Sequence, residues 1–259
     1  LPAACLEWSP GACPAASGFD YHQGTAFQVD ADDPVRPAAE HADKNLALRG
    51  YVPNTDPTLQ RELVAYDSRT EVQPPQIATM FSPFRVPTLV RFYRVHHWQW
   101  APSPDPGYRS DPISSPPVTA LGLATTAGEP VHVPESGHDL GGEYAALVLY
   151  ADDESVTLRY TRDDSAAPAG YTLHIRGLCT DPDLLALYDE LDDPAGPRYD
   201  FPNASYPLPI LRAGQRIGTA RGRSLIIAIA DSGAFQDPRS CADWWQIRPG
   251  YTGTCPSHE

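Results

Sequence analysis

Histidine is the residue type in this chain with the widest chemical use, and its eight copies are dispersed along the sequence. A catalytic zinc needs about three His or carboxylate ligands plus an open position. One set could supply them, namely His132, His138, Asp139 and His174. No HExxH or His-x-His pattern accompanies these residues. Structural or surface histidines are therefore the favoured interpretation, and we predict no metal and no cofactor.

Other catalytic motifs are also missing. The chain contains no GxSxG nucleophile elbow and no GxxxxGK[ST] phosphate-binding loop. Gly214–Gly218 contains two glycines, but it indicates a turn that enters a strand rather than a helix. A dinucleotide site needs a helix N-terminus at that place. We therefore predict no catalytic residue.

Tryptophan offers a second kind of chemistry. Trp98 and Trp100 end an expected strand, and Trp244, Trp245 and Tyr251 lie near the C-terminus. An exposed pair could stack on sugar rings, whose C–H faces pack on an aromatic ring, whereas a buried pair would close the core. These five aromatic residues are the candidate binding residues for a glycan or for another subunit.

The five cysteines indicate an oxidising compartment. Cys5 and Cys13 flank a Ser-Pro-Gly turn, and Cys241 and Cys255 bracket a short loop. We predict these two local disulfides, with Cys179 as a buried free thiol. Such pairs near both termini are typical of a secreted or cell-surface protein.

Composition limits the classes of partner. The chain has 259 residues and a formal net charge of −14, which disfavours binding to nucleic acid. No run approaches 18 apolar residues, so we expect no membrane-spanning helix. Proline contributes 29 residues, which indicates many turns and irregular loops.

The elements that position these residues are mostly strands. A strand is expected from 88 to 95, extended through Trp100, followed by six more at 118–124, 130–133, 144–150, 155–160, 171–175 and 225–230. Two short helices are expected, one opening at Asp56-Pro57 and one at Asp181-Pro182, each with Asp as N-cap and Pro at the first helical position. The expected fold class is therefore all-β, with a twisted antiparallel core sheet and long Pro-rich arms.

This pattern predicts three regions. Residues 1–117 form an irregular N-terminal arm with a short helix and one strand, and residues 118–238 form the β core. Residues 239–259 form a C-terminal tail closed by a disulfide.

The core region resembles the lysostaphin-like zinc endopeptidases, which cleave peptidoglycan. The stretch from Ala120 to Gly137, with its Gly-Glu-Pro-Val turn, resembles the first core hairpin of that family. Residues 144–150 and 156–162 resemble its next two strands. Leu211–Gly218 is similar to its Gly-Gln-x-Ile-Gly turn, and Leu225–Pro238 to the strand that carries its His-x-His. The resemblance covers about 120 residues and implies the fold of a twisted antiparallel sheet.

The resemblance also implies that the zinc site is missing. The positions of the family's ligands are occupied here by Val118, Gly122, Arg162, Ser224 and Ile226. An alternative alignment places His174 on the second histidine of His-x-His, which restores one ligand only. A dication is not bound by this set.

Three functions remain open from the sequence. The leading one is a secreted or cell-surface non-catalytic β module that binds glycan, peptidoglycan or other subunits. The second is a metal-dependent hydrolase that uses the set around His132 and His174. The third is a structural subunit of an extracellular assembly, docked through its Pro-rich arms.

Overall fold

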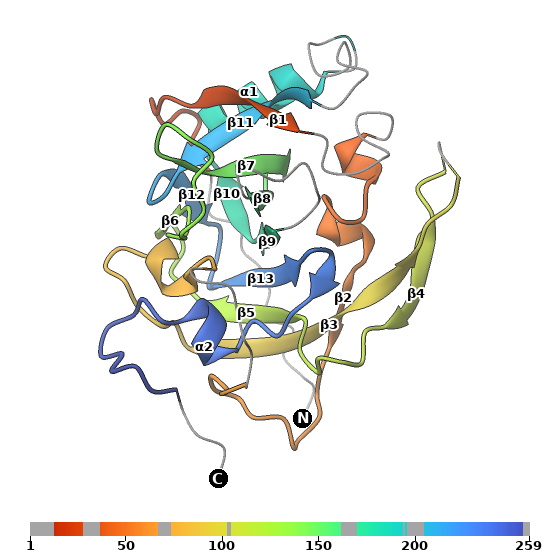
Figure 1. The fold of residues 1–259 in the computed structure, drawn as a ribbon, viewed down its shortest axis with the longest axis vertical. Coiled ribbons are helices and arrows are strands. Elements are labelled where there is room, and N and C mark those ends of the chain that lie inside the picture. The colour runs from red at the N-terminus through yellow and green to blue at the C-terminus, as the bar shows by residue number, and fades with distance from the viewer. Residues whose placement is uncertain are drawn as a thin grey trace.

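The protein, analysed as a computed structural model, is built around one large antiparallel sheet (Figure 1). The structure describes residues 13–27, 37–66, 74–102, 105–161, 170–193, 195 and 205–255. Eleven strands join the large sheet, in the order β1-β11-β7-β8-β9-β13-β5-β3-β2, with β14 added to β13 and β4 added to β3. Strands β10, β12 and β6 form a second, smaller sheet. The expectation of a β-rich antiparallel fold is confirmed.

The strands of the large sheet are β1 (His22–Phe27), β2 (Tyr51–Pro53), β3 (Leu89–Gln99), β4 (Tyr108–Pro112), β5 (Ala120–Ala124), β7 (Tyr144–Ala151), β8 (Ser155–Thr161), β9 (Gly170–Arg176), β11 (Ser205–Arg212), β13 (Ser224–Asp231) and β14 (Ala234–Phe235). The small sheet holds β6 (Pro130–His132), β10 (Leu178–Thr180) and β12 (Arg216–Ala220). All seven predicted strands are present, within about two residues at most ends. The tight turn after β7 forms at Asp152, whose N–H donates to the Ser155 carbonyl oxygen.

Alternation along the central strands explains why one face of the large sheet makes the core. In β8, Val156, Leu158 and Tyr160 point to one face and are fully buried. Their neighbours in β9, β13 and β7 contribute the same kind of apolar side chain, because successive residues of a strand face opposite sides. The main hydrophobic core therefore lies on this face. The residues between them face the other side, and they build the site described below.

Helices are few. The helix α1 (Pro182–Asp192) is capped as predicted, because the Asp181 carboxylate accepts a hydrogen bond from the Asp183 N–H at 3.1 Å. The expected helix after Asp56 is wrong. That carboxylate accepts hydrogen bonds from the N–H and hydroxyl of Thr58 and holds a local turn instead. The second helix is α2 (Cys241–Trp244), and the single-turn 3₁₀ helices are η1 (Ala38–Glu40), η2 (Leu46–Leu48) and η3 (Ile77–Met80).

The N-terminal region contains more regular structure than the sequence indicates. It supplies β1, β2, β3 and β4, and β3 pairs with β5 in the same sheet. The large sheet thus runs across the expected boundary at 117/118. β1, β2 and β4 were missed because all three lie in segments rich in Gly, Pro and polar residues, which have no clear alternation.

The disulfides correct one prediction and confirm another. Cys241–Cys255 is present as expected. Cys13 bonds to Cys179, 166 residues further along the chain, so the Cys5–Cys13 pair and the free thiol at Cys179 are both wrong. Cys5 lies outside the described residues. The long-range bond ties the segment before β1 to strand β10 of the small sheet.

Candidate functional site

A stripe of polar side chains crosses the second face of the large sheet. Thr157 and Arg159 of β8 lie directly opposite His174 and Thr172 of β9. All four are at least 94 % buried. The next strand, β13, contributes only small side chains beside them, because Ala228 pairs with His174 and Ala230 with Thr172. A polar stripe next to two alanines leaves room for a cavity.

Residues 38–50, here called the strap, cross over this polar stripe. The Thr157 hydroxyl donates to the Lys44 carbonyl oxygen at 2.6 Å, which fixes the strap to the sheet. Arg49 is 93 % buried, and it donates hydrogen bonds to the carbonyl oxygens of Ala42 and His96 and to the Asp43 carboxylate. The strap is thereby bound to two strands of the large sheet, β8 through Thr157 and β3 through His96.

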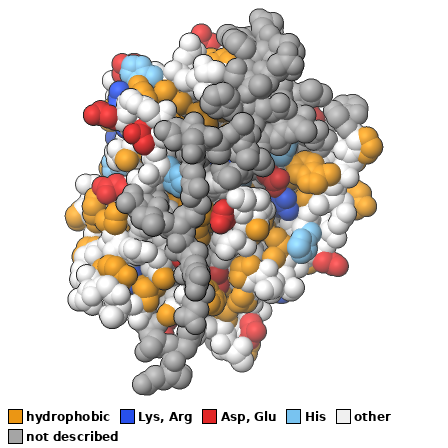
Figure 2. Space-filling model, in the orientation of Figure 1, with side chains coloured by type: hydrophobic (Ala, Val, Ile, Leu, Met, Phe, Trp, Pro, Cys, Tyr) orange, Lys and Arg blue, Asp and Glu red, His pale blue; other side chains and the backbone are white. Residues whose placement is uncertain are grey.

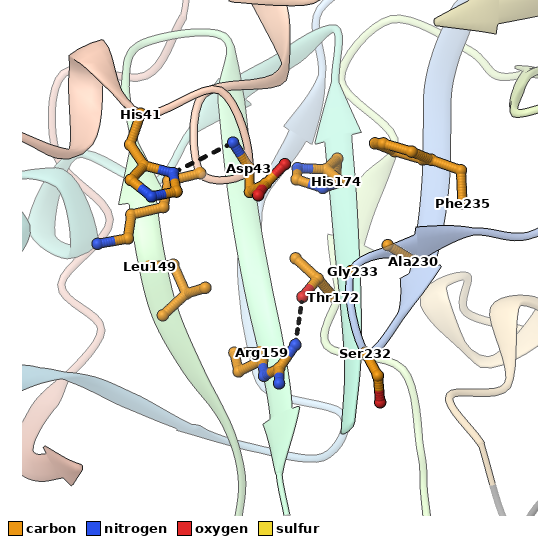
Figure 3. Close-up of a pocket in the computed structure, with 11 residues that line it drawn as sticks. His41, Asp43, Leu149, Arg159, Thr172, His174, Ala230, Ser232, Gly233 and Phe235 are labelled. Atoms are coloured by element: carbon orange, nitrogen blue, oxygen red, sulfur yellow. Dashed lines mark hydrogen bonds between the residues drawn. The ribbon is translucent and has the colours of Figure 1, made fainter. Parts of the chain in front are cut away.

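The strap and the sheet enclose a pocket of about 160 Å³. Side chains reach it from the strap, from β7, β8 and β9, and from the β13–β14 hairpin (Figure 3). Its lining residues are His41, Asp43, Lys44, Leu149, Arg159, Thr172, His174, Ala230, Ser232, Gly233 and Phe235. Hydrogen-bond donors, acceptors and the phenyl ring of Phe235 therefore meet in a single cavity, which is the usual make-up of a ligand site.

His174 is neutral at physiological pH, and its tautomer follows from its partner. Burial lowers the pKa of this imidazole from 6.5 to about 3, against the opposing effect of the Asp43 carboxylate. The only proton of the Thr157 hydroxyl goes to the Lys44 carbonyl, so Thr157 must accept from His174 Nδ1, 3.0 Å away. The proton of the ring therefore sits on Nδ1, and Nε2 keeps a lone pair. The ring also stacks on Phe235, with 6.1 Å between centroids.

Arg159 brings a buried cation to the floor of the pocket. Burial lowers the pKa of its guanidinium, while the Asp231 carboxylate raises it. An arginine stays protonated under such shifts. One Nη atom donates to the Thr172 hydroxyl oxygen at 2.8 Å. The Thr172 hydroxyl keeps its own proton, which it can donate to a ligand.

Trp100 lies against the strap wall of the pocket. Its ring packs on His41 at 4.7 Å between centroids, and Trp98 meets Trp100 edge to face at 6.3 Å. Trp100 is 44 % exposed, and Tyr108 on the paired strand β4 is 66 % exposed. Figure 2 shows hydrophobic surface beside acidic, basic and histidine side chains on the side where β3 and β4 lie. We call Trp98 and Trp100 the tryptophan platform.

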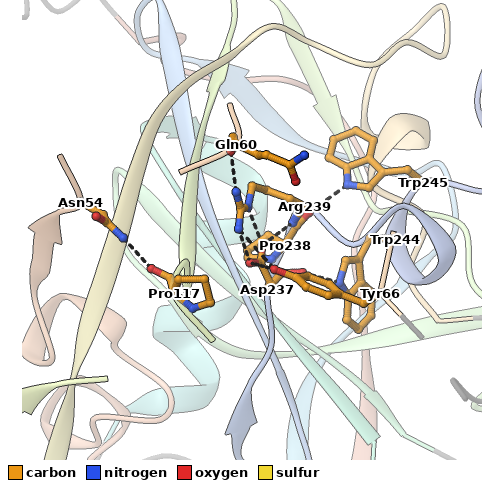
Figure 4. Close-up of polar contacts among 9 residues, drawn as sticks. All are labelled: Asn54, Gln60, Tyr66, Pro117, Asp237, Pro238, Arg239, Trp244 and Trp245. Atoms are coloured by element: carbon orange, nitrogen blue, oxygen red, sulfur yellow. Dashed lines mark hydrogen bonds and ion pairs between the residues drawn. The ribbon is translucent and has the colours of Figure 1, made fainter. Parts of the chain in front are cut away.

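The other predicted aromatic pair belongs to the core. Trp244 and Trp245 are buried, at 1 % and 0 % exposure, so they offer no surface to a glycan. Their indole N–H groups donate to the carbonyl oxygens of Asp237 and Pro238, each at 2.9 Å (Figure 4). The alternative of core packing therefore holds for this pair, because both rings lie inside the core at α2, and the two residues are not candidates for binding a glycan. Tyr251 is partly exposed and lies under the Arg248 guanidinium.

The candidate metal ligands are not brought together. His174 lies in the pocket, His132 Nδ1 lies 3.2 Å from the Met80 carbonyl oxygen, and His138 packs edge-on against Tyr171. Among the described residues, no group of three or more His, Cys, Asp or Glu side chains is placed to hold a metal ion. Asp139 instead accepts a hydrogen bond from the Gly141 N–H.

Two of the positions that would hold zinc ligands in the lysostaphin-like family lie next to each other in the sheet. Gly122 of β5 is the register partner of Ile226 of β13 and also lies opposite Arg91 of β3. A side chain at Gly122 would approach Arg91 to 3.1 Å, so β3 covers this place. Arg162 lies outside the described residues.

No protein-family model matches the chain, and no curated protein matches it significantly. No helix in the described part of the chain is long and apolar enough to cross a membrane. The function is therefore argued from the geometry of this site.

Of the residues that line the pocket, the sequence pointed only to His174, and it offered this residue as a metal ligand. The other polar lining residues, Arg159, Thr172 and Asp43 among them, were not predicted. The sequence did contain a pattern that could have located these residues. Apolar and polar residues alternate in the same way in 156–161 (VTLRYT) and in 171–176 (YTLHIR). Both segments place polar side chains on the face opposite the core, which is unusual for two central, buried strands.

Proposed function

We propose that this protein is a non-catalytic carbohydrate-binding β module that acts outside the cell. The observation that carries the proposal is the contact between the tryptophan platform and the pocket, made by the 4.7 Å packing of Trp100 on His41. An exposed indole gives a flat apolar surface for one sugar ring. The adjacent polar pocket supplies the hydrogen bonds that would orient a neighbouring ring.

The polar groups of the pocket suit a polyhydroxylated ligand. Asp43 and His174 Nε2 are acceptors for sugar hydroxyl groups, and Thr172 and Arg159 are donors. Sugar hydroxyl groups both donate and accept, so a mixed lining can satisfy several of them at once. The two disulfides support an extracellular location, since such bonds persist in oxidising compartments.

The lysostaphin-like resemblance remains a hypothesis on evolutionary origin. It is compatible with the placement of Gly122 opposite Ile226 on neighbouring strands, because two ligands of one metal ion must lie close together. Peptidoglycan is accordingly one of the glycans to test.

Trp100→Ala tests the proposal. We expect the native protein to be retained by at least one polysaccharide in affinity electrophoresis, across a panel that includes pectin, xylan, cellulose and peptidoglycan. Trp100→Ala should weaken that retention about two- to tenfold, because stacking on an indole contributes about 0.5–1.5 kcal/mol. The thermal midpoint should change by only about 2–3 °C, because the ring is 44 % exposed.

Phe84→Ala is the matched control. Phe84 is 42 % exposed, and it precedes the opposite end of β3 from Trp100. This variant removes a similar exposed ring and should bind as the native protein does. Equal losses in both variants, or no retention of the native protein by any polysaccharide, would contradict the proposed function.

A further inference from the structure

The Asp, Arg and Lys side chains that line the pocket already have partners. One oxygen of the Asp43 carboxylate pairs with the Arg49 guanidinium of the strap. The Asp231 carboxylate stabilises the charge of Arg159. Lys44 likewise has an interaction partner of its own. A charged ligand would therefore find no unpaired counterion among the described lining residues, and its burial there would be costly.

Two acceptor atoms of the pocket are left without a donor by the described part of the chain. His174 is 4 % exposed and donates from Nδ1 to Thr157, so its Nε2 atom is an acceptor. No described residue donates to this Nε2 atom or to the second oxygen of Asp43. The Asp43 carboxylate extends toward the His174 ring (Figure 3) and acts electrostatically on it. Two unfilled acceptors in one cavity favour a ligand that donates hydrogen bonds.

Hydroxyl groups suit these acceptors better than an ammonium group does. The buried cation of Arg159 lies in the same lining and would repel a second positive charge. The Thr172 hydroxyl oxygen accepts from Arg159, so its own proton is left for the ligand. A sugar hydroxyl both donates and accepts. Hydroxyl groups of one ring can therefore use Asp43, His174 and Thr172 together.

The size of the cavity limits the ligand further. A cavity of about 150 Å³ accommodates one six-membered ring, and the pocket has about 160 Å³. Leu149 and Phe235 give the lining an apolar part, on which the C–H groups of a sugar ring can pack. One ring therefore fits, while the next ring of a chain would lie outside the pocket.

From the paired charges, the two acceptors and the size together, we infer that the pocket receives one uncharged sugar ring, whose hydroxyl groups donate to Asp43 and to His174 Nε2. The ligands are then neutral glycans, not polymers of uronic acids or of unacetylated amino sugars. This inference rests on the proposed function, and it names the substrate class of the same site. A neighbouring sugar of the same chain stacks on the tryptophan platform.

Six soluble trisaccharides test the inference by isothermal titration calorimetry. Tri-galacturonic acid is compared with its carboxyl-reduced neutral counterpart. Chitotriose, whose amines are protonated in mildly acidic buffer, is compared with its N-acetylated neutral counterpart, and cellotriose and xylotriose are further neutral probes. Every ring of the two charged probes carries a charge, so neither can place an uncharged ring in the pocket. We expect the tightest probe to be neutral, and both charged probes to bind at least about tenfold more weakly than it does.

His174→Asn tests the acceptor. The amide of Asn keeps a donor for the Thr157 hydroxyl oxygen, but its shorter side chain has no acceptor at the position of Nε2. This variant should bind the best neutral probe about threefold to tenfold more weakly, because one hydrogen bond to the ligand is lost. His22→Asn is the matched control, because His22 is an exposed histidine of the edge strand β1 and does not line the pocket. It should bind as the native protein does.

Asp43→Asn tests the charge balance separately, and it decides the question if His174→Asn does not fold. The amide leaves Arg49 without its carboxylate, so the pocket gains a net positive charge. The affinity for tri-galacturonic acid should then rise to within about threefold of that for the best neutral probe. Asp153→Asn is the control, because it removes an exposed carboxylate from an ion pair with Arg221 outside the pocket. This control should leave the ratio of the two affinities unchanged.

The outcomes separate the inference from the proposed function. A charged probe that binds as tightly as the best neutral probe would overturn the inference and leave a glycan-binding module. An unchanged affinity in His174→Asn, or an unchanged ratio in Asp43→Asn, would overturn it as well. So would retention of the native protein by the polysaccharide panel without binding of any neutral trisaccharide. Absence of binding for all six probes and for the panel would remove the proposed function and the inference together.

Discussion

His174 is the residue whose surroundings decide most about the site. Its neutral state depends on complete burial, and its tautomer depends on the single proton of Thr157. A neutral histidine that is buried in the folded state but solvated in the unfolded state makes stability depend on pH. The strap, which covers the ring, is therefore coupled to the protonation of this one side chain.

We expect acid to destabilise the protein through His174. The folded pKa is about 3 and the ordinary value is 6.5, so the unfolded state binds more protons below pH 6.5. Stability is therefore lost as the pH falls from 6.5 towards 3, by about 1.4 kcal/mol per pH unit, or about 2 kcal/mol at pH 5. His174→Asn keeps a hydrogen-bond donor near Thr157. Between pH 7 and pH 5, its free energy of unfolding should fall by about 2 kcal/mol less than that of the native protein. Urea denaturation at both pH values measures the difference.

His97→Gln is the control for this experiment, because His97 is exposed. It should keep the pH dependence of the native protein. A native protein whose free energy of unfolding is the same at pH 7 and pH 5, or a His174→Asn variant with an unchanged pH dependence, would contradict the burial argument.

Among the elements, the segment before β1 depends most on distant partners. The Ser17 hydroxyl donates to Asp181, and the Gly18 N–H donates to Asp183, so this segment helps to cap α1. The Cys13–Cys179 disulfide joins the same segment to β10. These contacts hold a short, otherwise irregular stretch against an element that lies more than 160 residues away.

The two disulfides should contribute unequally to stability. In the chain-entropy model, a bond that spans 166 residues contributes about 5 kcal/mol, and one that spans 14 residues contributes about 3 kcal/mol. Replacing Cys13 and Cys179 by Ala should therefore lower the free energy of unfolding more than replacing Cys241 and Cys255. Cys5→Ala, which alters neither bond, is the control. Equal losses in the two double variants would show that denatured-state entropy does not govern these bonds.

Across the whole molecule, the large sheet makes the expected regions interdependent. Strand β3 pairs with one edge of β5, and the buried helix η3 packs in the main core. Val64 forms a bridge to Ser240. All three come from the region before residue 118. Removal of that region would expose one long edge of β5 and much of the core.

A fragment that starts at residue 118 should therefore not fold by itself. We expect residues 118–255 to lack near-ultraviolet circular dichroism and to show no cooperative thermal transition, under conditions in which the full chain shows one. Adding the separate fragment 13–117 should restore part of the signal. A cooperative transition in 118–255 alone would instead support an independent β core with the boundary that the sequence predicts.

Local sequence was sufficient for seven of the fourteen strands that the described residues form, for α1 and for one disulfide. Alternation over five to eight residues identified β7, β8, β9 and β13, because a sheet with one apolar core repeats its pattern every two residues. The Asp-Pro start identified α1, since both residues act within the first turn. The same signal failed at Asp56, where too few residues follow before Val64 joins Ser240, and a short helix cannot offset its nucleation cost.

Only the tertiary structure decided the site. The amino acids that line the pocket lie between His41 and Phe235 in the sequence, and no local pattern relates the strap to β8 and β9. Exposure of the tryptophans was likewise undetermined, because the same Trp-Trp dipeptide is compatible with a surface patch or a core. The partner of Cys13 is 166 residues away. A contact between residues so far apart in the sequence depends on how all the strands are arranged in the sheet. The periodicity of a sequence indicates only which face of its own strand a residue occupies.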